Sequence, residues 1–148
     1  MRTYIYRLIA LLITVTIFSC DSYLINGDLD GFWQVVNIED KRNGEITYPQ
    51  GDIYYSFQQE LVLISFVSPT TPTGQMKENY IAYFSYVNES ITMGDFRIYL
   101  DKDGKQVPLE RLEKFGLYDI YSTFRVDKLN KKSMILDSKD SRIVFRKY

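Results

Sequence analysis

Hydrophobic and polar residues alternate along most of this chain, in short runs separated by turn-forming residues. Tyr, Phe, Ile and Val are frequent in the runs, and this pattern is typical of β-strands that bury one face. It predicts strands at residues 31–39, 53–58, 61–67, 80–87, 91–93, 96–100, 124–129, 133–137 and 142–146. Turn-rich stretches separate them, and the longest, at 68–79, contains two prolines, three threonines and a glycine.

One late segment has helical rather than strand spacing. Leu109, Leu112 and Phe115 recur at helical intervals among charged residues. Pro108 occupies a suitable first helical position, and Gly116 follows as a stop. We therefore expect a short helix from Pro108 to Phe115, before the last strands.

The short, regularly spaced strands indicate an all-β, antiparallel fold, either a closed barrel or a sandwich. A barrel has the advantage that it leaves no strand edge exposed. A chain of 148 residues fits one such domain.

The N-terminus has the layout of a secretory leader. Arg2 and Arg7 precede an apolar run over 8–18 that only two threonines interrupt. This run is too short to span a bilayer, which needs about 20 apolar residues. We expect residues 1–19 to be a signal peptide.

The only cysteine of the chain stands where this apolar run ends. The order Ile17, Phe18, Ser19, Cys20 resembles the lipobox of bacterial lipoproteins. The resemblance implies cleavage after Ser19 and acylation of Cys20, so that the acyl chains, at about 0.8 kcal/mol per buried methylene, hold the protein at a membrane. Residues 20–30 would then be a lipidated tether, and 31–148 the folded domain. The alternative is a leader without lipid, or a short membrane anchor, with Cys20 an incidental thiol.

The composition of the chain argues against several classes of function. Removing the leader takes Arg2 and Arg7 from the 18 basic residues and leaves all 19 acidic ones, a net charge of −3 that gives no support to nucleic-acid binding. The chain has no histidine, the side chain used most often for proton transfer and metal ligation near neutral pH. We expect no enzymatic activity, no cofactor and no metal site.

Two short motifs are turns rather than sites. Asp101–Gly104 resembles the start of a calcium loop, but the twelfth position of that loop is Leu112 instead of a bidentate glutamate. The triplet Asn88-Glu89-Ser90 matches a glycosylation sequon of only three residues. We interpret it as the turn of a hairpin.

The start of the first strand carries a family resemblance. Gly31-Phe32-Trp33 resembles the Gly-x-Trp signature of lipocalins, in which the tryptophan plugs the closed end of a β-barrel. An arginine of the last strand packs over that indole in the family, which implies Arg142 or Arg146 here.

The layout of the whole chain, from the lipobox to the final strands, is similar to that of the small lipocalin-like lipoproteins common in Bacteroidetes. The resemblance implies a lipocalin-like, calycin-like antiparallel barrel of about eight strands. It also implies a place in the cell envelope, on the outer membrane facing the periplasm.

Aromatic residues of the central strands are the candidate ligand contacts. Tyr80, Phe84 and Tyr86 share one face of a strand, and Tyr55 and Phe57 share one face of another. If these faces line an open barrel, they would bind a small apolar or amphipathic molecule at the end opposite Trp33, with 68–79 as a lid.

If the same side chains instead fill the barrel, the outer surface would bind an envelope protein, as an inhibitor or accessory subunit. A contiguous exposed aromatic patch would favour that second reading.

Overall fold

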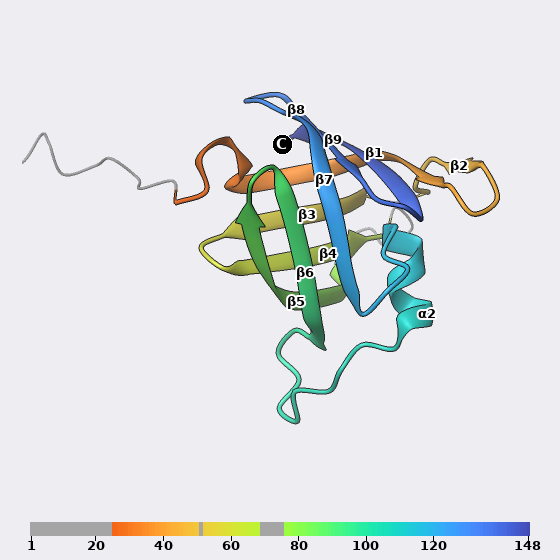
Figure 1. The fold of residues 1–148 in the computed structure, drawn as a ribbon. Coiled ribbons are helices and arrows are strands. Elements are labelled where there is room, and N and C mark those ends of the chain that lie inside the picture. Colours follow the sequence, from red (N-terminus) through yellow and green to blue (C-terminus); the bar gives the residue numbers. More distant parts are fainter. Residues whose placement is uncertain (1–24, 51, 69–75) are drawn as a thin grey trace, which may run out of the picture.

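The alternating segments pair edge to edge in an antiparallel sheet that closes on itself (Figure 1). This computed structural model describes residues 25–50, 52–68 and 76–148. The elements in chain order are η1 (Gly27–Leu29), β1 (Gly31–Asp40), β2 (Glu45–Thr47), β3 (Asp52–Gln58), β4 (Leu61–Val67), β5 (Met76–Val87), β6 (Ser90–Ile98), α2 (Leu109–Leu112), η2 (Glu113–Phe115), β7 (Tyr121–Leu129), β8 (Ser133–Asp137) and β9 (Ser141–Lys147).

Eight of the strands form the barrel. Each of β3 to β8 pairs with the next strand in sequence, β1 pairs with β3, and β9 returns to pair with β1. Among the described strands, β2 pairs only with β1, and it lies beside the last three residues of that strand, Ile38 to Asp40. The predicted all-β antiparallel class is confirmed, and the fold is a barrel rather than a sandwich.

Alternation decides which side chains enter the barrel. Along β7, buried Ser122, Phe124 and Val126 are separated by exposed residues, and β9 buries Ser141, Ile143 and Phe145 in the same way. Successive side chains of a strand point to opposite faces, so one set from every strand meets inside. These sets make one continuous hydrophobic core.

The sequence pattern missed β2. Its three residues are all exposed, so no burial alternation marks them, and backbone pairing with β1 alone makes them a strand. The short hairpin that β1 and β2 form projects from the barrel (Figure 1).

Two strand boundaries also differ from the prediction. β5 begins at Met76, inside the predicted loop 68–79, because this stretch pairs with the end of β4. The predicted strands 91–93 and 96–100 are one strand, β6, in which Asp95 (φ +56°) lies at a shift in register with β5. A glycine and an aspartate in sequence resemble a turn, but here they belong to a β-bulge.

The predicted hairpin at Asn88-Glu89 is confirmed. These two residues join β5 to β6 with φ values of +50° and +59°, as two-residue hairpin turns of type I′ require. Asp101–Gly104 is also a turn, since Gly104 N–H donates to the Asp101 carbonyl oxygen over 3.1 Å.

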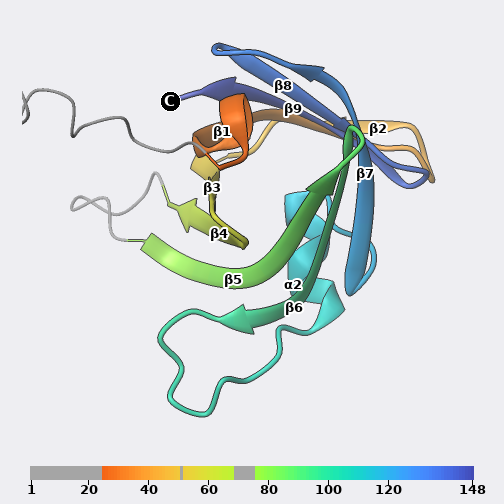
Figure 2. The ribbon, with the colours of Figure 1, turned by 60° about the vertical axis from the view of Figure 1, so that its left-hand side comes forward.

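The predicted helix is present between β6 and β7, as α2 followed by the tighter turn η2. The connection that contains it leaves the barrel after β6 and returns to it at α2 (Figure 2). Gly116 ends η2 with φ +82°, and a Cβ there would lie 2.9 Å from Ile143 Cδ1. Only glycine has both the backbone freedom and the small size that this approach to the barrel requires.

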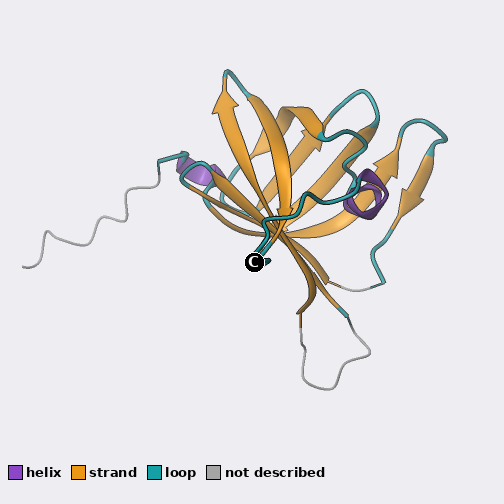
Figure 3. Ribbon diagram, turned by 90° about the horizontal axis from the view of Figure 1, so that it is seen from below, coloured by secondary structure: helices purple, strands orange, loops and turns teal. Residues whose placement is uncertain are grey.

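The two helical segments lie on opposite sides of the barrel (Figures 1 and 3). The 3-10 helix η1 comes just before β1, at the end that contains Trp33. Gly116, after η2, lies against Ile38 and Ile143, near the other end of β1. Each end of the barrel is therefore covered by a different segment of the chain.

Candidate functional site

Four of the five predicted ligand contacts lie in the core of the barrel, and the fifth packs against that core. Tyr55, Phe57, Tyr80 and Phe84 are buried, and Tyr86 is partly buried against the same core. The ring centroids of Phe57 and Phe84 are 5.1 Å apart at an interplanar angle of 84°, the edge-to-face geometry that aromatic pairs favour. Tyr55 makes a similar contact with Phe145, at 5.1 Å. The alternation predicted the facing of these side chains, and they pack as a core.

The end opposite Trp33, predicted to be open, is occupied by residues 109–117. Leu112, Phe115 and Leu117 from this segment, which we call the plug, are fully buried. The Phe115 ring lies edge-on to Tyr80, with centroids 5.6 Å apart. The predicted lid was a different segment: residues 69–75 lie outside the described residues, and 76–79 are part of β5.

Two buried hydroxyl groups hold the plug to the barrel wall. Tyr55 donates from Oη to the Phe115 carbonyl oxygen over 2.8 Å, and Ser141 donates from Oγ to the Gly116 carbonyl oxygen over 2.7 Å. Both carbonyl groups come at a helix end, where the backbone has no partner of its own. These bonds could not be predicted from the sequence, because each joins segments far apart along the chain.

An ion pair on the rim adds to this attachment. Lys114 Nζ of η2 lies 2.7 Å from Glu78 Oε2 of β5, and Tyr80 donates from Oη to the same oxygen over 2.6 Å. Burial works to raise the pKa of Glu78, but the hydrogen bonds from Lys114 and Tyr80 outweigh it, and the net result is a lowered pKa.

The hydroxyl groups of Tyr55 and Tyr80 both donate hydrogen bonds in the interior. Burial raises the pKa of Tyr55, and burial together with the hydrogen bond to Glu78 raises the pKa of Tyr80 to about 12. Both therefore stay protonated at neutral pH and act as hydrogen-bond donors.

Trp33 closes the other end, as the lipocalin resemblance implied. It is fully buried, and its Nε1 donates to the Leu29 carbonyl oxygen of η1 over 2.7 Å. Gly31, two residues earlier, has φ +117°, and a Cβ there would lie 3.1 Å from Lys147 Nζ. A glycine is thus required where the chain turns from η1 into β1.

The cation over the indole is Lys147 rather than the expected Arg142 or Arg146. Lys147 Nζ lies 4.2 Å from the Trp33 ring centroid and donates to the carbonyl oxygens of Asp28 and Asp30. Burial lowers the pKa of this lysine against the opposing effect of the two aspartates.

Strand alternation explains this correction. Lys147 is the direct cross-strand partner of Trp33, so the two side chains share a face, whereas Arg142 and Arg146 point outward. Arg146 donates from Nε to Gln34 Oε1 over 2.7 Å, and Arg142 pairs with Asp127 and Asp137.

Part of the predicted tether belongs with this closed end. Asn26 donates to Asp30 and to the Gln59 carbonyl oxygen, and Leu29 is fully buried. Cys20 and the predicted signal peptide lie outside the described residues, so cleavage and lipidation stay predictions. In the described part of the chain, no helix has the length and apolar character needed to cross a membrane.

The depressions found on the described part of the molecule lie at the two ends of the barrel and along its wall. Of the predicted ligand contacts, Tyr86 lines one of these depressions. It measures about 340 Å³ and lies beside η1, with Asn26, Asp28 and Glu89 also in its lining. Others run along the wall, at Ile25, Leu61 and Tyr83, or near the plug. Within the described ranges, no three acidic or cysteine side chains gather as a metal site would require.

Two exposed apolar features of the surface were not predicted from the sequence. Ile46 and Tyr48 stand on the projecting β1–β2 hairpin, and Ile25, Leu61 and Tyr83 come together on the barrel wall. The exposure of alternate strand residues was predictable, but the meeting of three separate segments on one wall requires the pairing register.

Comparison with known proteins agrees with this architecture. Two solved structures share it: a lipocalin-like protein from Bacteroides uniformis, with a TM-score of 0.60 and 20% identity over 82% of this chain and 100% of that one, and an uncharacterized protein from Bacteroides eggerthii, with a TM-score of 0.60 and 22% identity over 81% and 99%. At such identities the likeness shows the fold alone. No curated protein matches the sequence.

The closed antiparallel barrel with a tryptophan at its base is a lipocalin-type fold. The family model described as a lipocalin-like domain matches residues 12–148. The chain belongs to this lipocalin-like family, which confirms the resemblance seen in the sequence.

Proposed function

We propose that this protein is a lipid-anchored envelope protein that acts through the outer surface of a filled barrel, by binding another protein. The observation that carries the proposal is that chain segments cover both ends of the barrel, with Trp33 at one and Phe115 at the other. An eight-stranded barrel is only just wide enough to be packed by side chains or to hold one small ligand. Here its own aromatic residues pack the interior.

The leader and the lipobox-like order around Cys20 support a lipid anchor, and the family resemblance supports its place on the outer membrane, facing the periplasm. The described chain starts at Ile25, five residues after this cysteine, and joins the barrel base directly. We further propose that the protein is not an enzyme, because the interior hydroxyls are hydrogen-bond donors with raised pKa values and the sequence has no histidine.

The β1–β2 hairpin is the candidate partner surface. Ile46 is exposed and Tyr48 is 64% exposed, while β2 has one neighbouring strand among those described. The second edge of β2 therefore offers backbone N–H and C=O groups, to which an extended segment of a partner can add. The exposed apolar side chains beside it would supply the rest of the contact.

A ligand inside the barrel is the second candidate. Two features of the plug favour this candidate. The plug belongs to the long connection 99–120 rather than to a strand of the barrel, and the two buried hydroxyl groups of Tyr55 and Ser141 hold it. A molecule that displaced Phe115 would enter a space lined by Tyr55 and Tyr80.

A fluorescent fatty acid, cis-parinaric acid, separates the two candidates. Wild type is expected to show no saturable binding, whereas Phe115→Ala, which opens a cavity at a cost of about 3–5 kcal/mol in stability, should bind. Leu109→Ala, on the adjoining helix α2 and only partly buried, is the matched control and should behave as wild type. Stoichiometric binding by wild type would contradict the filled barrel.

Capture from the solubilised envelope of the native host tests the protein partner. We expect the lipidated wild type and Leu100→Ser, a change at an exposed leucine of the connection 99–120, to retain the same protein. The double variant Ile46→Asp, Tyr48→Ser should lose it. Identical retention of the partner by the wild type and both variants would rule out the hairpin as the partner surface.

A further inference from the structure

We infer that the anchored barrel rests on the bilayer through one patch of its wall, formed by Ile25, Leu61 and Tyr83, which we call the Ile25 face. The inference rests on the proposed lipid anchor at Cys20. It adds an orientation of the barrel, and a lipid surface as the occupant of this patch.

The Ile25 face is a continuous apolar surface. Ile25 is 67% exposed and Tyr83 is 60% exposed, and both line a shallow groove of about 360 Å³ with Leu61. Leu61 and Tyr83 are direct cross-strand partners on β4 and β5, so their side chains stand side by side. A second depression of about 310 Å³ continues from these two residues to Ile81.

The length of the tether identifies the bilayer as the occupant. Ile25 comes five positions after Cys20, with four residues between them, and a chain extends by at most about 3.6 Å per position, so Ile25 lies within about 18 Å of the acylated cysteine. Contact with the bilayer is then intramolecular, at an effective concentration of roughly millimolar or above. A small patch that would bind free vesicles weakly is enough under these conditions.

The chemistry of the face fits the membrane interface. Tyr83 offers a ring and a hydroxyl group, the combination that makes tyrosine frequent at the headgroup level, and Ile25 and Leu61 offer aliphatic surface. The charges around it nearly cancel, because Asp95 pairs with Arg97 at 3.0 Å and Glu60 is the other charged lining residue. The contact should therefore be hydrophobic, insensitive to salt, and suited to zwitterionic headgroups.

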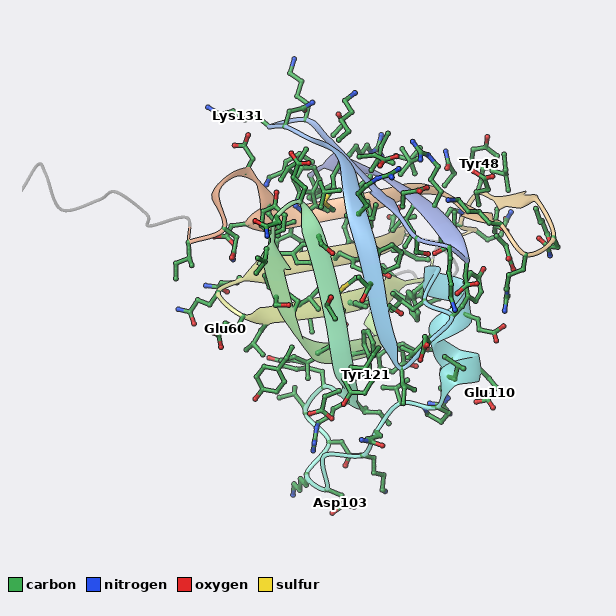
Figure 4. All side chains as sticks on the ribbon, in the orientation of Figure 1. Tyr48, Glu60, Asp103, Glu110, Tyr121 and Lys131 are labelled. Carbon is green, nitrogen blue, oxygen red and sulfur yellow. The ribbon has the colours of Figure 1, made fainter. Side chains whose placement is uncertain are left out.

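This orientation leaves the proposed partner surface free. Figure 4 shows Glu60, which lines the groove of the Ile25 face, on one side of the molecule and Tyr48 on the opposite side. A barrel that lies with the Ile25 face on the bilayer thus directs the β1–β2 hairpin away from it.

Quenching by brominated lipids tests the contact. The full chain is produced in a host that processes lipoproteins, its acylation is checked by mass, and it is reconstituted in phosphatidylcholine vesicles with or without bromine on the acyl chains. A tryptophan is placed on the face by Tyr83→Trp, or on the hairpin by Tyr48→Trp, a tyrosine of similar exposure. The buried Trp33 of the wild type gives the background to subtract.

We expect the tryptophan of Tyr83→Trp to be quenched at least twofold more than that of Tyr48→Trp, and Leu61→Ser in the Tyr83→Trp background to reduce the difference. Equal quenching of the two in an acylated protein that floats with the vesicles would overturn the docking and leave the anchor intact. A protein without acyl chains would overturn the anchor and, with it, this inference.

Discussion

Lys147 combines three interactions at the closed end of the barrel. Its ammonium group lies over the Trp33 ring and donates to the carbonyl oxygens of Asp28 and Asp30, so it joins the last strand to η1 and to the start of β1. A cation over an indole contributes about 0.5–2 kcal/mol, depending on how far it is desolvated. The partial burial of Lys147 favours the upper part of this range, and the same burial lowers its pKa.

Lys147→Met should lower the free energy of unfolding by about 2 kcal/mol, because the aliphatic stem is kept while the charge and its hydrogen bonds are lost. Urea unfolding followed by Trp33 fluorescence measures the change. Lys139→Met, at a highly exposed lysine, is the control and should stay within about 0.5 kcal/mol of wild type. A loss no larger than that of the control would show that Lys147 does not stabilise the base.

Alternation along the strands predicted which residues share one face of the barrel wall. It put Tyr55 with Phe57 and Tyr80 with Phe84 on one face of a strand, and both faces are buried inside the barrel, whereas the place of Trp33 followed from the family resemblance. Alternation did not show whether Lys147 or Arg146 lies over Trp33. That depends on the register of the last strand, which a resemblance to a family motif does not fix. The bond from Tyr55 to Phe115 was also out of reach, since a strand pattern carries no information on distances across a barrel.

The plug is the element on which the functional interpretation depends most. Its apolar residues were expected to form a helix, and they do, but helical spacing does not say which surface the helix covers. The choice depends on Gly116, which allows close approach to Ile38 and Ile143, and on carbonyl groups that Tyr55 and Ser141 can reach. The lid at 68–79 was predicted from composition alone, and because residues 69–75 lie outside the described residues, that role stays a prediction.

Glu78 makes the attachment of the plug sensitive to acid. A carboxyl group whose pKa is lower in the folded than in the unfolded state stabilises the fold above the unfolded pKa, and this contribution is lost as the pH falls through the folded value. The pKa of Glu78 lies below its ordinary 4.5, with burial opposing and the bonds from Lys114 and Tyr80 prevailing. Its contribution is therefore complete at pH 7 and declines below pH 4.5.

Glu78→Gln should cost about 1 kcal/mol of unfolding free energy at pH 7, and the difference from wild type should shrink towards pH 3. Urea titrations at the two pH values give this difference directly. Glu110→Gln, an exposed change on α2, should have little effect at either pH. A difference between Glu78→Gln and wild type that is the same at both pH values would contradict the proposed role of the carboxylate.

At the scale of the molecule, pairing of the first barrel strand with the last closes the structure. β1 and β9 are matched from Trp33 opposite Lys147 to Asp40 opposite Ser141, so the barrel forms only when the two ends of the domain have met. One continuous core joins all eight strands to the plug. Such an arrangement has few parts that could unfold separately.

We therefore expect two-state unfolding. The urea transition seen by fluorescence of Trp33, which lies at one end of the barrel, should coincide with the transition seen by far-UV circular dichroism, which reports the whole sheet. Separate midpoints would show that the base or the plug unfolds independently.

The closure of the barrel also determines where the molecule tolerates an added tag. The Tyr148 amide donates to the Phe32 carbonyl oxygen, so the C-terminus emerges beside η1, next to the point where the chain enters the barrel. A fluorescent protein or affinity tag fused after Tyr148 would be crowded into the gap between the barrel and the proposed lipid anchor. The Asp101–Gly104 turn, at the tip of a long connection (Asp103 in Figure 4), is the better insertion point for imaging and purification.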